Sequence, residues 1–84
     1  MRLTREVRQQ LLEQNEGFEV KTCTREKNFV EYRQYLITGG ELRIRSSGKT
    51  SWADSRFDNE AVATDEQTRR FLREHLAELN TDGV

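Results

Sequence analysis

Hydrophobic and polar positions alternate on both sides of a Gly-Gly pair in the middle of the chain. Tyr35 and Ile37 precede Gly39-Gly40, and Leu42 and Ile44 follow it. Because a two-residue type I′ turn needs positive φ at both central residues, this pattern predicts a β-hairpin. In the register that the turn imposes, Ile37 faces Leu42 and Tyr35 faces Ile44, so one face of the hairpin is apolar.

The other face of this hairpin is mixed, since the same register pairs Leu36 with Arg43 and Gln34 with Arg45. Tyrosine and arginine are enriched at protein interfaces, and both residue types occur here. We therefore expect a binding surface on this face. Its predicted residues are Lys21, Tyr32, Gln34, Leu36, Arg43 and Arg45.

Periodic patterns predict the other regular elements as well. A helix over 4–15 begins at Thr4, strands follow over 18–24, 29–38 and 41–46, and a final helix runs from Thr64 to about Asn80. Thr64 and Gln67 have the spacing of a capping box, in which side chain and backbone satisfy each other. We expect His75, on the apolar stripe of this helix, to lie at the edge of the core.

Residues 50–63 show neither the helical spacing of apolar residues nor the alternation of apolar and polar residues that is typical of a strand. Trp52, Phe57 and Val62 are large apolar side chains that we expect to reach the core, whereas the polar residues between them suit turns. The segment is predicted to be a short helix or an irregular loop, with a short edge strand near 49–52 as the alternative.

These elements predict an α+β fold of order α-β-β-β-(short irregular or helical segment)-α. It comprises a three-stranded antiparallel meander with both main helices packed on one face. Residues 1–84 form one small domain in which 81–84 fray. The predicted core is Phe18, Val20, Tyr35, Ile37, Leu42 and Ile44, covered by Val7, Leu11, Phe71, Leu72, Leu76 and Leu79.

The composition narrows the class of protein. Of 84 residues, 33% are hydrophobic and 35% are charged, which leaves a small core under a strongly solvated surface. The single cysteine, Cys23, excludes an internal disulfide framework and a cysteine-rich zinc site, and it favours a reducing cytoplasm. No apolar run approaches the length of a membrane helix, and the start at Met1 directly before a helix signal is typical of a complete small reading frame.

Charge is unevenly distributed along the chain. Residues 21–50 hold seven Lys or Arg against three acids, whereas residues 51–84 hold four Arg against eight acids. A basic strand face could bind nucleic acid, and the residues for that alternative are Lys21, Tyr32, Arg43, Arg45 and Lys49. The net charge of −1 and the pI of about 5.8 weigh against it.

Catalytic and metal-binding patterns are weak. His75 is the only histidine and falls on an apolar stripe, and Asp54, Asp58 and Glu60 lack the spacing of a calcium loop. The order helix, three strands, helix resembles that of double-stranded-RNA-binding domains and of HicA-type toxin ribonucleases. The resemblance covers element order alone: Thr64-Asp65-Glu66 is acidic where the former are basic, and the strands lack the histidine of the latter.

The sequence therefore predicts a small non-enzymatic accessory or regulatory protein of the cytoplasm. It would bind a protein partner or a second copy of itself through the mixed strand face, and the alternative is a nucleic-acid-binding module. We expect no catalytic residue, metal, cofactor, membrane contact or small-molecule substrate.

Overall fold

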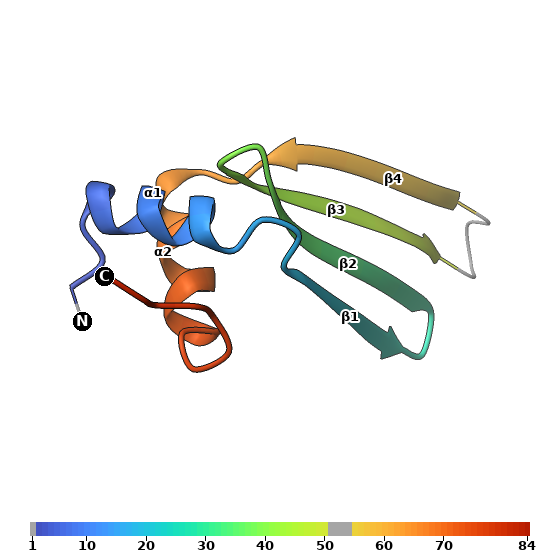
Figure 1. Cartoon of the computed structure of the whole chain (residues 1–84). Coiled ribbons are helices and arrows are strands. Elements are labelled where there is room, and N and C mark those ends of the chain that lie inside the picture. Colours follow the sequence, from blue (N-terminus) through green and yellow to red (C-terminus); the bar gives the residue numbers. More distant parts are fainter. Residues whose placement is uncertain (1, 51–54) are drawn as a thin grey trace.

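The computed structural model describes residues 2–50 and 55–84, and within them all side chains except those of residues 50 and 55–57. It has an α+β fold, as predicted (Figure 1). The elements in chain order are α1 (Arg5–Gln14), β1 (Glu19–Glu26), β2 (Phe29–Thr38), β3 (Glu41–Thr50), β4 (Ser55–Val62) and α2 (Asp65–Glu74).

The strands form one antiparallel sheet in the order β1-β2-β3-β4. The predicted hairpin register is confirmed, with Ile37 opposite Leu42 and Tyr35 opposite Ile44. Gly39 and Gly40 have φ of 60° and 74°, values that a two-residue type I′ turn requires and that glycine adopts without steric cost. The turn chemistry thus places every side chain of β2 and β3 on its face of the sheet.

The prediction of a three-stranded meander was wrong, because residues 55–62 form a fourth strand in place of an irregular or helical segment. β1 and β3 also extend beyond their predicted ends at 24 and 46. Val62 does not reach the core: it is 49% exposed on the last residue of β4. Trp52 and the side chain of Phe57, also expected in the core, lie outside what the structure describes.

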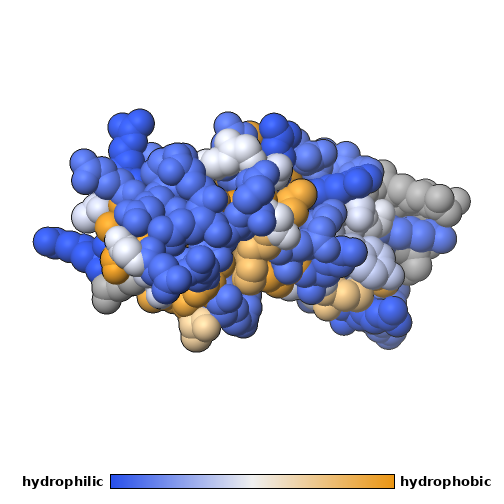
Figure 2. All heavy atoms as spheres, in the orientation of Figure 1, coloured by the Kyte–Doolittle hydropathy of each residue, from blue (hydrophilic) through white to orange (hydrophobic). Residues whose placement is uncertain are grey.

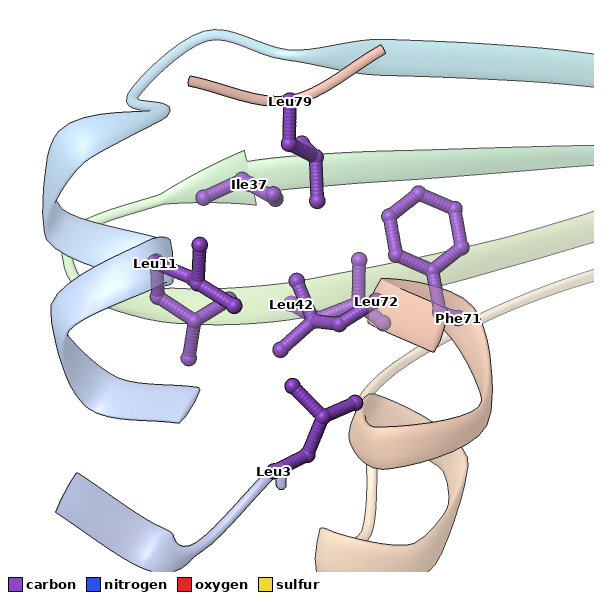
Figure 3. Packing of buried hydrophobic residues seen from close by; sticks show 8 residues of the cluster. Leu3, Leu11, Ile37, Leu42, Phe71, Leu72 and Leu79 are labelled. Carbon is purple, nitrogen blue, oxygen red and sulfur yellow. The ribbon is translucent and has the colours of Figure 1, made fainter. Parts of the chain in front are cut away.

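Both helices gather at one end of the sheet and leave the other end projecting, which makes the molecule elongated, at 49 × 21 × 20 Å (Figure 1). Side chains from both helices meet Ile37 and Leu42 on one face of the sheet (Figure 3). The buried cluster is Leu3, Leu11, Leu12, Ile37, Leu42, Phe71, Leu72 and Leu79. The predicted one-sided cover by helices therefore holds for one end of the sheet and not for its length.

Caps fix where the helices begin. The Val7 N–H donates to Thr4 Oγ1 at 3.3 Å, and Thr64 and Gln67 form the predicted capping box. α2 ends at Glu74, several residues earlier than expected, yet Leu79 from the following turns is still buried. The apolar stripe thus continues into the core beyond the end of the observed helix.

The C-terminal tail lies against α1, although the sequence suggested that residues 81–84 fray. The Asn80 N–H donates to Asn15 Oδ1 at 2.8 Å, and Asn15 Nδ2 donates to the Asn80 carbonyl at 3.0 Å. Gln14 Nε2 donates to the Asp82 carbonyl at 2.7 Å. Val84 packs against the hydrophobic cluster. The tail closes the core on the side of α1.

Candidate interaction face

The outer face of the sheet, which is turned away from the helices, carries all six predicted binding residues. The strand register sets Lys21, Gln34 and Arg45 in one row across β1, β2 and β3, and Glu60 of β4 extends this row. The row nearer the helices contains Leu36 and Arg43, and the row toward the projecting end contains Tyr32. The structure therefore brings together the residues that alternation had assigned to one face.

Apolar side chains on the outer face follow the central strand β2 and the end of β4. Tyr32 and Val62 are each 49% exposed, and both lie on this face. Val30 and Leu36 are half-buried on the same side of β2. With a rise of about 3.3 Å per residue, the strip from Val30 to Leu36 is about 20 Å long. It offers apolar contact area along the middle of an otherwise polar face.

Arg45 is bound by a carboxylate from the fourth strand. Its Nε and Nη2 donate to Asp58 Oδ1 and Oδ2 at 3.1 and 2.7 Å, a bidentate pair. The hydrogen bonds from the guanidinium hold the pKa of the Asp58 carboxyl below its usual value. Both side chains are more than half exposed, so solvent weakens the pair. Its main consequence is that Arg45 is charge-compensated.

The other predicted cations on this face also have acids beside them. Arg43 lies 3.7 Å from carboxylate oxygens of both Glu41 and Glu60, and Lys21 Nζ lies 3.5 Å from Glu19. Gln34 Nε2 donates to Glu19 at 2.5 Å. Sequence reasoning missed Asp58 and Glu60 because it placed no strand at 55–62, from which these acids reach Arg45 and Arg43. The register also places Arg25 and Lys49 on this face, in the row that contains Val30. Lys21, Arg43 and Arg45 are thus each paired with a carboxylate.

Tyr32 lies among polar and charged side chains. The Cys23 thiol, which hydrogen-bonds the Arg25 guanidinium, and the neighbouring Tyr32 hydroxyl together raise the pKa of Arg25. A hollow of about 260 Å³ opens beside Tyr32. Four of the six predicted residues line it, namely Lys21, Tyr32, Gln34 and Arg45. This hollow is shallow and open, which suits a protruding side chain of a partner better than an enclosed small molecule.

A larger groove of about 480 Å³ lies on the helix side, where α2 leaves the sheet. Its floor is an aromatic cluster in which Tyr35 stacks on Phe71 with ring centroids 5.2 Å apart, and His75 lies 4.6 Å from Phe71. Hydrophobic side chains gather at this junction of helices and sheet (Figure 2). These aromatic rings pack at the end of the hydrophobic core. Core packing therefore explains why they lie together, and no ligand is needed to explain the groove.

His75 occupies the core boundary expected for it, with its ring against Phe71 and its Nδ1 3.3 Å from Glu78 Oε2. Within residues 2–50 and 55–84, no group of His, Cys, Asp and Glu side chains is arranged to hold a metal ion. None of the described helices has the length and apolarity needed to cross a bilayer.

Comparisons with protein-family models, with curated proteins and with solved structures gave no match. The physical properties of the outer face are therefore the basis for assigning a function.

Proposed function

We propose that this chain is a small, non-enzymatic binding protein that engages another protein through the outer face of its sheet. The observation that carries the proposal is that the two large hydrophobic side chains exposed in the described part of the chain, Tyr32 and Val62, lie on this one face. On the helix-side face of the projecting end, by contrast, most side chains are polar, with Phe29 near the tip.

The arrangement of the outer face fits a protein partner. An apolar strip with Tyr32 at its centre is bordered by charged side chains, as at protein interfaces, where buried aromatic anchors supply affinity and a polar rim supplies specificity. Because Arg43 and Arg45 are compensated by acids of β3 and β4, the partner would need to present both charge signs around an apolar centre. A reducing cytoplasm suits the exposed thiol of Cys23.

Nucleic-acid binding remains the second candidate function, and the same carboxylates weigh against it. Glu19, Asp58 and Glu60 lie within 3.7 Å of Lys21, Arg45 and Arg43. Phosphate binding gains most of its free energy from neutralising charge on cations that are free to meet it. A phosphate group approaching Lys21, Arg43 or Arg45 would also meet the carboxylate beside that cation.

The experiment is a capture from lysate of the source cells with three baits: the wild type, Tyr32→Asp and the control Asn59→Asp. Asn59 is exposed on β4 but on the opposite face of the sheet, beside Ser46. We expect one protein to bind in stoichiometric amount to the wild type and to the control, to be lost with Tyr32→Asp, and to survive nuclease and moderate salt.

Two results would overturn the proposal. Equal loss of the partner with both substitutions would mean that the outer face is not the contact. Recovery of nucleic acid alone, with affinity that falls steeply as salt is added, would assign the face to phosphate binding. Circular dichroism of each bait checks that the fold is retained, which we expect because both side chains are exposed.

A further inference from the structure

The outer strand β1 is an open sheet edge. In the sheet order it pairs with β2 alone, and every residue from Lys21 to Glu26 is exposed. The strand contains no proline, and its pairing with β2 runs without a bulge from Glu19 opposite Leu36 to Glu26 opposite Phe29. Natural proteins usually block such an edge by a bulge, a proline or a covering segment. Here only charged side chains protect it.

The hydrogen-bonding groups that point outward from β1 follow from the ladder. The Ile37 N–H donates to the Phe18 carbonyl at 2.9 Å, so the hydrogen-bonded pairs with β2 fall on even-numbered residues of β1. The N–H and C=O groups of Glu19, Lys21, Cys23 and Arg25 therefore point away from β2 into solvent. They offer a regular template for one more antiparallel strand.

We propose that the occupant of this edge is β1 of a second copy, which pairs antiparallel about a two-fold axis through Thr22 and continues the sheet across both chains. A two-fold axis normal to the sheet keeps equivalent side chains on the same face, so only registers centred on a residue are allowed. Two such registers pair nearly the whole strand, one centred on Thr22 and the other on Cys23.

The charge order of the strand selects between these two registers. Centring on Thr22 sets Glu19 opposite Arg25 of the second copy, twice by symmetry, and Lys21 opposite the uncharged Cys23. Centring on Cys23 instead sets Lys21 opposite Arg25, twice. Opposite charges across strands stabilise pairing and like charges directly opposite destabilise it, so the Thr22 register is favoured.

The remaining pairs of the Thr22 register are compatible with a sheet. On the helix side, Thr22 faces Thr22 and Val20 faces Thr24 of the second copy, and β-branched pairs of this kind suit pleated strands. The same charges that disfavour pairing with an unrelated strand thus match each other in one self-complementary arrangement. This dimer leaves the outer face free, and it does not depend on the function proposed for that face.

The first test is a charge exchange followed by sedimentation equilibrium over a range of protein concentrations. Glu19→Arg and Arg25→Glu are each expected to weaken dimerisation about tenfold, because two facing pairs become repulsive. The combined variant Glu19→Arg/Arg25→Glu restores opposite charges across the axis and should recover dimerisation. Its contacts within one chain, to Lys21 and to Cys23, stay broken, so loss of local structure cannot produce the recovery.

The second test reads the register by disulfide trapping. In the Thr22 register the Thr22 pair is not hydrogen-bonded, with Cα atoms about 4.5 Å apart, a separation that a disulfide can span. Thr22→Cys in a Cys23→Ser background should therefore cross-link rapidly under mild oxidation. The control Thr24→Cys in the same background faces Val20 of the second copy and should cross-link slowly.

Three results would contradict the dimer or its Thr22 register. A wild-type mass that stays monomeric at all concentrations rejects the dimer. Faster cross-linking of the wild type through its native Cys23 than of the Thr22→Cys/Cys23→Ser variant would assign the Cys23 register. Failure of the combined charge variant to recover would mean that β1 is not the contact. Tyr32→Asp should leave dimerisation intact, so failure of this proposal and failure of the outer-face proposal are distinguishable.

Discussion

The two ends of the sheet are stabilised in different ways. At the helix-packed end, residues 35–44 contribute Ile37 and Leu42, which are 0% and 1% exposed beneath side chains of both helices. At the projecting end, which spans residues 21–34, 45–50 and 55–60, none of the side chains that the structure describes is buried. One end has a core (Figure 3), and the other, which projects beyond the helices (Figure 1), is held by backbone pairing and by side chains that meet across strands.

This difference separates stability from binding in the molecule. Apolar burial supplies most of the stabilising free energy of a small domain, and here it is confined to one end. Substitutions at the projecting end should therefore change the free energy of folding little. Its surface residues can be suited to binding a partner without loss of stability. Both the outer-face residue Tyr32 and the open edge of β1 belong to that end.

The largest expected effect follows from removing a core side chain. Leu72 is fully buried, so Leu72→Ala should lower the free energy of unfolding by about 2–5 kcal/mol. Tyr32→Ala, at the projecting end, should lower it by less than about 1 kcal/mol. Urea denaturation of both variants measures the difference. A comparable loss for both would show that the projecting end shares the core, and the comparison between the two ends would fail.

The next effect comes from the turn at the helix-packed end. Gly40 has φ of +74°, and a Cβ there would lie 3.0 Å from Gln9 Nε2 of α1. Gly40→Val should therefore cost about 1–3 kcal/mol, since a β-branched residue is strained at positive φ. Gly40→Asn is the matched control, because asparagine tolerates this conformation. If denaturation finds both variants as stable as the wild type, the turn does not constrain the hairpin.

The helix-packed end could be predicted from the sequence in most respects. The Gly39-Gly40 pair fixed the register of β2 and β3, and all twelve predicted core residues belong to the hydrophobic cluster or pack against it. Turn chemistry and one-sided burial leave a clear period in a sequence, because each residue either faces the core or faces water. The six predicted face residues followed from the same alternation.

The projecting end escaped prediction for the converse reason. β4 has solvent on both faces over much of its length, so polar residues such as Asp58, Asn59 and Glu60 follow one another without alternation. The pairing of Asp58 with Arg45 joins residues far apart in sequence and depends on the register of β4, which no local pattern provides. The sequence did contain one signal for this strand pairing. Two arginines lie two residues apart, Arg43 and Arg45, and two acids have the same spacing, Asp58 and Glu60.

A smaller effect is expected where the tail closes the helix-packed end. The Asn15 side chain makes three hydrogen bonds, to the Leu11 carbonyl and to both backbone groups of Asn80. Asn15→Ala should cost about 1 kcal/mol and speed amide exchange of Asn80 and Asp82. Asn80→Ala, which keeps the backbone groups that bind Asn15, is the control for the Asn80 amide; for Asp82 it also removes the Oδ1 acceptor of the N–H. Unchanged exchange in Asn15→Ala would mean that the tail is held by Val84 and not by these bonds.

The smallest effect belongs to the ion pair of the projecting end. Arg45 holds the pKa of Asp58 below its ordinary value, so the pair contributes stability above the unfolded-state pKa of Asp58 and loses it as pH falls through the folded one. In a carboxyl-carbon NMR titration, Arg45→Gln should raise the Asp58 midpoint toward the ordinary value. Arg43→Gln, whose partners are Glu41 and Glu60, should leave it in place.

Because Arg45 and Asp58 are both exposed, Arg45→Gln should hardly change stability at neutral pH, in contrast to Leu72→Ala. A large loss would mean that the projecting end depends on its ion pairs as the other end depends on its core.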